Sequence, residues 1–236
     1  MSRHALGLLL DPPDARDFLW HDLLRVPDRL PRSFRWRTCG PVLEQGSRPH
    51  CVAYATATVK LVDEWKEGRI WHAFDEGWLY ARCKERDGKP DRPGTNLRTA
   101  FKIVQQEGYP SRGTYVRARR HDGPERRFRL KTYAKLGSLR ALKHAVRTAG
   151  PVAFGIRVDD GIHKPVDGVV PEPSGKPFGG HAVCVTGWDD GIGALRIKNS
   201  WGYDWGDRGF GWLPYSHLDA YRWNAWKAVD IVGEPA

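Results

Sequence analysis

The pattern of apolar residues changes at residue 151, and this change restricts the possible folds of the chain most. Before it, apolar side chains recur at helical spacing over residues 51–67, 75–84, 96–107 and 138–150. After it, short runs rich in Val, Ile and aromatic residues predict strands at 152–158, 182–188, 195–198, 209–213 and 227–232. Helices followed by strands predict an α+β protein in which a helical lobe packs on a β lobe. A cleft between two lobes is a common place for a functional site.

Composition narrows the class of protein. The chain has 236 residues, of which 40% are hydrophobic and 28% charged, and its mean hydropathy is −0.58. These values are typical of a globular protein with one large domain or two lobes. The apolar stretch at residues 5–10 is too short for a transmembrane helix or a signal-peptide core, and four cysteines exclude a disulfide scaffold. We therefore expect a cytoplasmic protein, or one exported without a signal peptide.

The net charge of +10 is concentrated in one stretch. Residues 111–148 contain 12 Lys and Arg against only Asp122 and Glu125, while the charges of the other residues balance. A solvated arginine-rich surface explains such a stretch. It would also attract an acidic protein face, nucleic acid or an anionic membrane.

Cys51 lies where the longest predicted helix begins, directly after Pro49 and His50. The free N–H groups and the dipole of a helix N-terminus stabilise a thiolate and lower the pKa of a cysteine. A single cysteine in such a place is more commonly structural. The sequence therefore needs further residues before it indicates catalysis.

Three further residues supply what a thiolate nucleophile requires. His181 opens a predicted strand after two glycines, Asn199 follows another strand, and Gln45 stands six residues before Cys51. A thiolate that attacks a carbonyl needs a base, a partner that orients the base, and donors for the oxyanion. Cys51 precedes His181 by 130 residues and Asn199 by 148, which is within the spacing of papain-type enzymes.

Motifs around these residues match one known family. The most specific match is Asn199-Ser-Trp-Gly-Tyr-Asp-Trp-Gly-Asp-Arg-Gly-Phe-Gly, joined by Gln45-Gly-Ser, Gly150-Pro-Val and His181-Ala-Val. The chain resembles a papain-like (clan CA, C1-type) cysteine peptidase over nearly its whole length, and bacterial members most. The resemblance implies a papain-like two-lobe fold with an N-terminal helical lobe at about residues 30–110 and a C-terminal β-barrel-like lobe at about 111–236. The active site would lie in the cleft between them.

The resemblance also implies catalytic roles. Cys51 would be the nucleophile and His181 its proton partner, while Asn199 would orient the imidazole through a hydrogen bond that Trp201 shields from water. The side chain of Gln45 and the backbone N–H of Cys51 would bind the oxyanion.

The same resemblance places a substrate pocket. The family usually selects on the second residue before the cut, and Gly94, Gly155 and Ala182 would form the pocket for it, with Trp201 nearby. The small residues at 155 and 182 predict a roomy apolar pocket.

The chain departs from the family pattern Cys-Gly-Ser-Cys-Trp at the nucleophile. Arg48 stands in place of a cysteine, so the usual disulfide beside the site cannot form, Val52 replaces the tryptophan, and Gly180 precedes the histidine in place of Asp or Asn. None of these changes removes a catalytic role.

The remaining cysteines suggest no metal centre. Cys39, Cys83 and Cys184 lack the spacing of metal ligands, so we expect no metal and no cofactor. A disulfide between Cys39 and Cys83 is conceivable, although both would be free in a reducing cytosol.

Residues 1–29 precede the predicted peptidase domain at 30–236. They are rich in Pro, Asp and Arg without a helical period, which predicts an extended strap. Their number is too small for the family's usual inhibitory propeptide. We therefore expect a permanent structural element, with activity restrained by a partner, by location or by narrow specificity.

The favoured function is a cysteine endopeptidase that works through a Cys-His-Asn thioester mechanism. Two alternatives remain open: an acyl transferase or amidase with the same triad, and a basic partner-binding module. The expected partner is a protein or peptide substrate with acidic residues or an acidic face. An inhibitor or immunity protein would join it if the protein is a toxin-like effector. A membrane or nucleic-acid partner is not expected.

Overall fold

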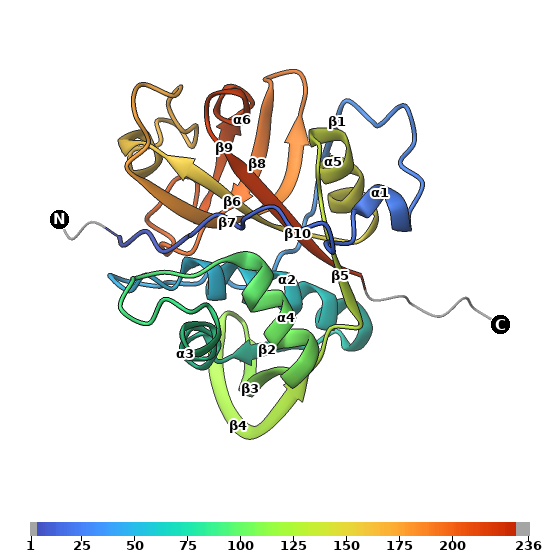
Figure 1. Ribbon diagram of the computed structural model, residues 1–236, viewed down its shortest axis with the longest axis vertical. Coiled ribbons are helices and arrows are strands. Elements are labelled where there is room, and N and C mark those ends of the chain that lie inside the picture. The colour runs from blue at the N-terminus through green and yellow to red at the C-terminus, as the bar shows by residue number, and fades with distance from the viewer. Residues whose placement is uncertain (1–3, 230–236) are drawn as a thin grey trace.

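The computed structural model describes residues 4–229 and shows two lobes packed on each other (Figure 1). The lower lobe in Figure 1 combines three helices with an antiparallel sheet in which β3 lies between β2 and β4. Its elements are α2 (Cys51–Gly68), α3 (Glu76–Arg86), α4 (Leu97–Glu107), β2 (Trp71–Phe74), β3 (Tyr109–Val116) and β4 (Arg119–Phe128).

The upper lobe is built on a seven-stranded antiparallel sheet with the order β5-β10-β6-β7-β8-β9, to which β1 adds by pairing with β7. The strands are β1 (Ser33–Arg35), β5 (Thr132–Lys135), β6 (Val152–Val158), β7 (Gly179–Asp189), β8 (Ala194–Lys198), β9 (Phe210–Pro214) and β10 (Trp223–Val229). The helices are α1 (Trp20–Leu23), α5 (Leu139–Thr148), α6 (Ser216–Ala220) and the 3-10 helix η1 (Asp160–His163). Within residues 4–229, no pairing joins the edge strands β5 and β9 into a closed barrel.

Both faces of β7 are buried, because each face supplies a different core. Ala182 and Cys184 belong to the apolar cluster around α2, whereas Val183 and Val185 belong to the cluster that includes α5. Burial on both sides explains why the strand is a continuous apolar run without polar alternation.

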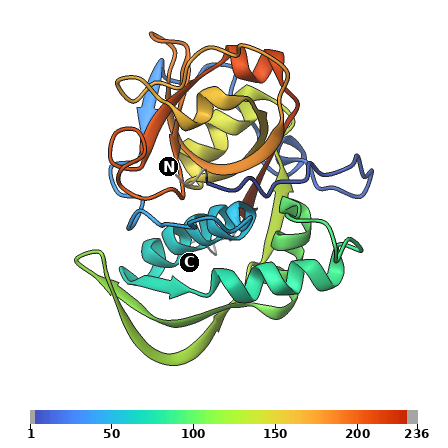
Figure 2. The same cartoon turned by 90° about the vertical axis from the view of Figure 1, so that its left-hand side faces the viewer.

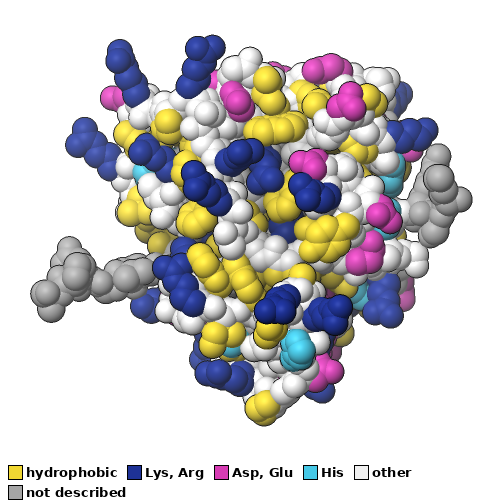
Figure 3. Space-filling view, turned by 180° about the vertical axis from the view of Figure 1, so that it is seen from behind, with side chains coloured by type: hydrophobic (Ala, Val, Ile, Leu, Met, Phe, Trp, Pro, Cys, Tyr) yellow, Lys and Arg dark blue, Asp and Glu magenta, His cyan; other side chains and the backbone are white. Residues whose placement is uncertain are grey.

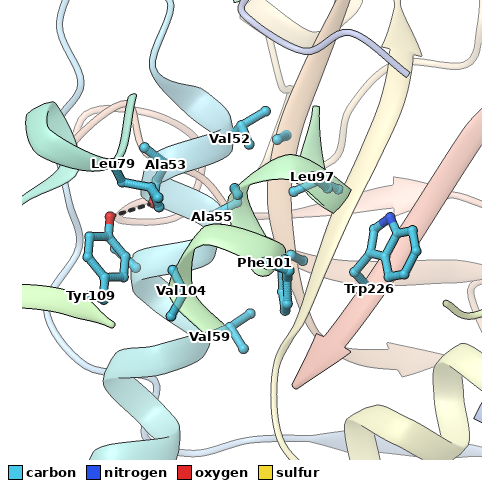
Figure 4. Packing of buried hydrophobic residues seen from close by; sticks show 14 of the residues in the cluster. Val52, Ala53, Ala55, Val59, Leu79, Leu97, Phe101, Val104, Tyr109 and Trp226 are labelled. Atoms are coloured by element: carbon cyan, nitrogen blue, oxygen red, sulfur yellow. Dashed lines mark hydrogen bonds between the residues drawn. The ribbon is translucent and has the colours of Figure 1, made fainter. Parts of the chain in front are cut away.

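The core of the lower lobe surrounds α2, which contributes buried side chains on all sides (Figure 4). Phe101 and Val104 of α4 pack against it, and the hydroxyl of Tyr109 donates a hydrogen bond to the carbonyl of Ala53 at 3.1 Å. Trp226 of β10 joins this cluster from the other lobe. The two lobes therefore share part of one core along α2.

Local signals in the sequence set the helix ends. The side chains of Asn96 and Ser138 accept hydrogen bonds from the backbone N–H of Thr99 and Ala141, so both act as N-caps. Gly108 ends α4 with a φ of +79°, which favours glycine. The predicted helices are all present, and the α+β class is confirmed.

The structure divides the basic stretch 111–148 between the lobes. Its first part forms most of the β3–β4 hairpin, which pairs with β2 in the lower lobe, and the seven-stranded sheet takes up the chain only at β5. Its last part is α5 in the upper lobe. Residues 111–148 therefore do not form one basic surface, although the sequence places their charges together. Figure 3 shows Lys and Arg side chains spread over the face of the molecule that it draws. The hairpin was not predicted, because residues 119–127 are exposed along their length and lack an apolar period.

The conceivable Cys39–Cys83 disulfide is absent: all four cysteines lie in the described part of the chain, and all are free and buried. In residues 4–229, no helix is long and apolar enough to span a membrane. Nor does any group of three His, Cys, Asp or Glu side chains there have the arrangement of a metal site. The predicted last strand begins earlier than expected, at Trp223, and residues 230–232 lie outside the described residues.

Candidate active site

Cys51 is the first residue of α2, and its side chain is fully buried. Burial raises the pKa of its thiol to about 11, more than the backbone N–H groups of Ala182, Gly7 and Val52 lower it. The lowered pKa expected from the helix N-terminus is therefore not seen in this arrangement, because the thiol is cut off from water.

His181 lies in β7 and Asn199 directly after β8, neighbouring strands that bring the two side chains together. The imidazole Nε2 and the Asn199 Oδ1 are 2.8 Å apart. The other nitrogen, Nδ1, is buried and has no hydrogen-bond partner among residues 4–229. Burial lowers the pKa of His181 to about 4, while the hydrogen bond with Asn199 acts in the opposite direction.

Trp201 covers the imidazole of His181. Its ring stacks on His181 with centroids 4.4 Å apart, and His163 and His4 stack on it at 4.7 and 5.0 Å. Only 2% of Trp201 is exposed. Trp201 thus keeps water away from the hydrogen bond between Asn199 and His181. A hydrogen bond in such surroundings is stronger than one in water.

The side-chain amide of Gln45 forms three hydrogen bonds. Its Nε2 donates to the carbonyls of Arg48 at 2.7 Å and Ala5 at 3.0 Å, and its Oε1 accepts from the hydroxyl of Ser200 at 2.7 Å. Ser200 therefore orients the amide, a role that the sequence reasoning missed although Ser200 follows Asn199 directly.

Residues 4–10 of the strap, named here the cleft segment, lie between the lobes (Figure 1, Figure 2). The N–H of Leu8 donates to the carbonyl of Gly180 at 3.0 Å, while Thr95 accepts from Leu9 at 2.7 Å and donates to Gly7 at 2.9 Å. The two hydrogen bonds of Thr95 make a parallel bridge between Leu8 and Thr95. These residues of the expected strap therefore occupy the cleft, and whether they are a permanent element stays a prediction.

The predicted pocket residues surround the cleft segment. Leu8 is 5% exposed, and a Cβ on Gly155 would lie 2.7 Å from its Cδ2. A Cβ on Gly94 would lie 2.4 Å from the carbonyl oxygen of Gly7. Ala182 is fully buried and pairs with Gly155 across β6 and β7. The small residues at these positions thus make room for an extended chain with a leucine side chain.

Two further residues at this pocket had no signal in the sequence. Asn224 of β10 pairs with Gly155, and its Oδ1 is buried beside Leu8 without a hydrogen-bond partner among residues 4–229. Its Nδ2 donates to the carboxylate of Asp11, which also accepts from Trp226 Nε1 and from the backbone N–H of Arg98. Asp11 therefore anchors the chain directly after the cleft segment.

Known proteins resemble this chain in sequence and in fold. A profile described as "Papain family cysteine protease" matches residues 30–219. The chain belongs to the papain family. Cathepsin S of Rattus norvegicus is 30% identical over 198 residues, which are 77% of this chain and 59% of that protein. Cathepsin S of Bos taurus is 30% identical over 203 residues, again 77% and 59%. The chain thus spans about three fifths of the length of these relatives.

Solved structures of papain-family proteins confirm the fold. Xylellain, a cysteine protease from Xylella fastidiosa, matches with a TM-score of 0.78 at 20% identity over 95% of this chain and 96% of its own. Procathepsin L2 from the larval midgut of Tenebrio molitor matches with a TM-score of 0.76 at 24% identity, over 96% and 78%.

A buried cation holds part of the chain before the nucleophile in this papain-family protein. The ammonium of Lys198 donates to the carbonyls of Cys39 at 2.5 Å and Pro41 at 2.7 Å and so holds the loop that leads to Gln45. His50 stacks on Tyr80 at 3.9 Å, and burial lowers its pKa. His50 is therefore not a cation that could stabilise a thiolate at neutral pH.

Proposed function

We propose that this chain is a cysteine peptidase that cleaves peptide bonds with Cys51, His181, Asn199 and Gln45. The observation that carries the proposal is the buried His181–Asn199 pair. The imidazole Nδ1 has no hydrogen-bond partner among residues 4–229. Ala182, the residue after His181, has a backbone N–H that lowers the pKa of the Cys51 thiol. Membership of the papain family supports it. This arrangement provides a nucleophile, a base and an orienting group.

The chemistry follows from these groups. The Cys51 proton passes to His181 Nδ1, and the sulfur attacks the carbonyl carbon of the scissile bond. The resulting oxyanion accepts hydrogen bonds from the amide of Gln45 and the backbone N–H of Cys51. The C–N bond then breaks, the leaving amine takes the proton from His181, and a thioester remains. Water, deprotonated by His181, attacks the thioester and releases the acid and the free thiol.

The cleft segment acts as an intramolecular blocker in this proposal. It runs from Trp201 and Gln45 toward Gly155, whereas a substrate would place its residues before the cut at Gly155 and those after it toward Trp201. Its direction is therefore opposite to that of a substrate. The group that meets the thiol is the N–H of Gly7 rather than a carbonyl carbon, so the segment fills the site without being cut.

No specific observation favours either of the two alternative functions. Nothing in residues 4–229 marks a site for an acceptor amine as acyl transfer would require. A basic binding module would need a continuous surface, and the stretch 111–148 is split between two lobes.

Covalent labelling tests the proposal directly. We expect a cysteine-directed epoxide to add one mass equivalent to the full chain, and Cys51→Ala to abolish the addition. His181→Ala should slow it at least tenfold, because the thiol then lacks the base that takes its proton during the attack. Cys39→Ala, a change at another buried free cysteine, is the matched control and should label normally. Labelling that persists in Cys51→Ala would contradict the assignment.

Gln45 gives a second prediction. Gln45→Ala removes a side-chain oxyanion donor and should lower kcat on a peptide substrate by about 10²–10³-fold with little change in KM. Ser200→Ala removes only the group that orients this amide and should have a smaller effect. Equal kcat values for Gln45→Ala and the parent chain would exclude Gln45 from the oxyanion site.

A further inference from the structure

The groove along the cleft segment carries charge of one sign. It has a volume of about 990 Å³, and among the described residues no Asp or Glu lines it. Its two histidines are His4 and His163. Its five cationic side chains are Lys89, Arg92, Arg157, Lys176 and Arg222.

These five cations make no ion pair with a carboxylate within residues 4–229, and two carboxylates near them have other partners. Asp87 pairs with Lys84 at 3.0 Å, and Asp159 accepts from the hydroxyl of Tyr221 at 2.8 Å. The guanidinium of Arg157 donates to the carbonyl of Pro177 at 3.2 Å. Asp91 is exposed and does not line the groove. A groove with several uncompensated cations attracts anionic groups.

The cations stand on both walls beyond the pocket that Leu8 fills. On the β lobe, Arg157 follows Gly155 by two residues and so lies on the same face of β6. The N–H of Arg157 donates to the carbonyl of Arg222 at 3.0 Å, which places these two residues side by side. On the opposite wall, Lys89 and Arg92 precede Gly94 in the loop between α3 and α4.

The cleft segment does not use these charges. Residues 5–10 read Ala-Leu-Gly-Leu-Leu-Leu and contain no acidic side chain. The segment therefore gains backbone hydrogen bonds and apolar contact, and leaves the cations for another occupant.

We propose that the groove selects peptides with Asp or Glu at the third and fourth residues before the cut, and that such peptides displace the cleft segment better than neutral ones. The inference rests on the proposed function, which sets the direction of the substrate. It also moves the acidic preference expected from residues 111–148 to a different set of cations.

Peptide binding to the full chain with Cys51→Ala tests this without turnover. Three fluorescent peptides share one sequence with leucine second before the cut, and carry Glu, Gln or Lys at the third and fourth positions. Because an exposed charge pair contributes up to about fivefold, we expect the Glu peptide to bind about tenfold tighter than the Gln peptide and the Lys peptide to bind weakest. The difference should shrink at high salt.

Two variants on opposite walls decide whether the groove is responsible. Arg222→Gln and the pair Lys89→Gln/Arg92→Gln should each reduce the preference for Glu about threefold or more, with little effect on the Gln peptide. Arg117→Gln/Arg119→Gln in the hairpin is the matched control and should leave it unchanged. Equal binding of all three peptides, or an equal loss in the hairpin control, would overturn the inference. Epoxide labelling of Cys51 in the parent chain reports on the proposed function separately.

Discussion

Removal of residues 1–9 is expected to raise kcat/KM on a small peptide by roughly 10- to 1000-fold. The cleft segment blocks the pocket at Gly155 and the amide of Gln45, so only the fraction of molecules with the segment displaced can bind substrate. A minor state of this kind is typically populated at about 0.1–10%, and the gain is the reciprocal of that fraction. The measurement is steady-state hydrolysis at low substrate concentration.

A point substitution tests the same blocker in the intact chain. A Cβ on Gly7 would lie 1.9 Å from the carbonyl oxygen of Pro49, so Gly7→Ala should displace the segment and raise kcat/KM. Gly137→Ala, where a Cβ meets no atom within 4 Å, is the control and should change nothing. Unchanged activity in both the truncation and Gly7→Ala would show that the segment does not restrain the enzyme.

Truncation should also change the pH dependence of the thiol. In the full chain, burial raises the pKa of Cys51 to about 11, so alkylation by iodoacetamide should increase with pH up to that range. Without the segment, water reaches the thiol, the largest cause of the raised pKa weakens, and the alkylation profile should move to lower pH.

Removal of residues 1–28 should have a different result, because the later part of the strap is structural. Trp20 is fully buried and donates through Nε1 to His144 at 3.0 Å, and Asp17 pairs with Arg98 at 2.6 Å. The longer truncation exposes this part of the core, so we expect loss of folded protein rather than a gain in activity.

Asp63→Ala is expected to destabilise the protein by about 3–5 kcal/mol. The carboxylate of Asp63 in α2 accepts two hydrogen bonds from the ammonium of Lys227 in β10, at 2.7 and 2.8 Å, with both side chains almost completely buried. This pair joins the lobes, and the substitution leaves the buried ammonium without this carboxylate. Urea unfolding at neutral pH measures the effect.

Two further variants distinguish the ion pair from simple loss of packing. Lys66 also contacts Asp63, at 3.2 Å, but its side chain is 34% exposed, so Lys66→Met should cost less than about 1 kcal/mol. Replacing both partners, as Asp63→Leu/Lys227→Leu, should restore much of the stability, because no buried charge remains. A double variant that is as unstable as Asp63→Ala would argue against the electrostatic cause.

The sequence predicted the four longest helices, α2 to α5, and the strands β6 to β10, because their signals are local. Caps such as Ser138, stops such as Gly108 and a long apolar run in β7 act within a few residues. The β3–β4 hairpin was not predicted, because its second strand is exposed along almost its whole length and has no apolar period. The divided basic stretch escaped because charge along the chain does not indicate which lobe each residue joins.

For the candidate site, the sequence by itself determined which chemical groups are available: a thiol at a helix start, an imidazole, two amides and small residues for a pocket. Residue identity and short motifs carry that information. Only the tertiary structure decided that residues 4–10 cover these groups, that Asn224 and Asp11 meet behind the pocket, and that unpaired cations from both lobes face the groove. These features depend on contacts between segments as much as 213 residues apart, and such contacts form only when the two lobes pack together.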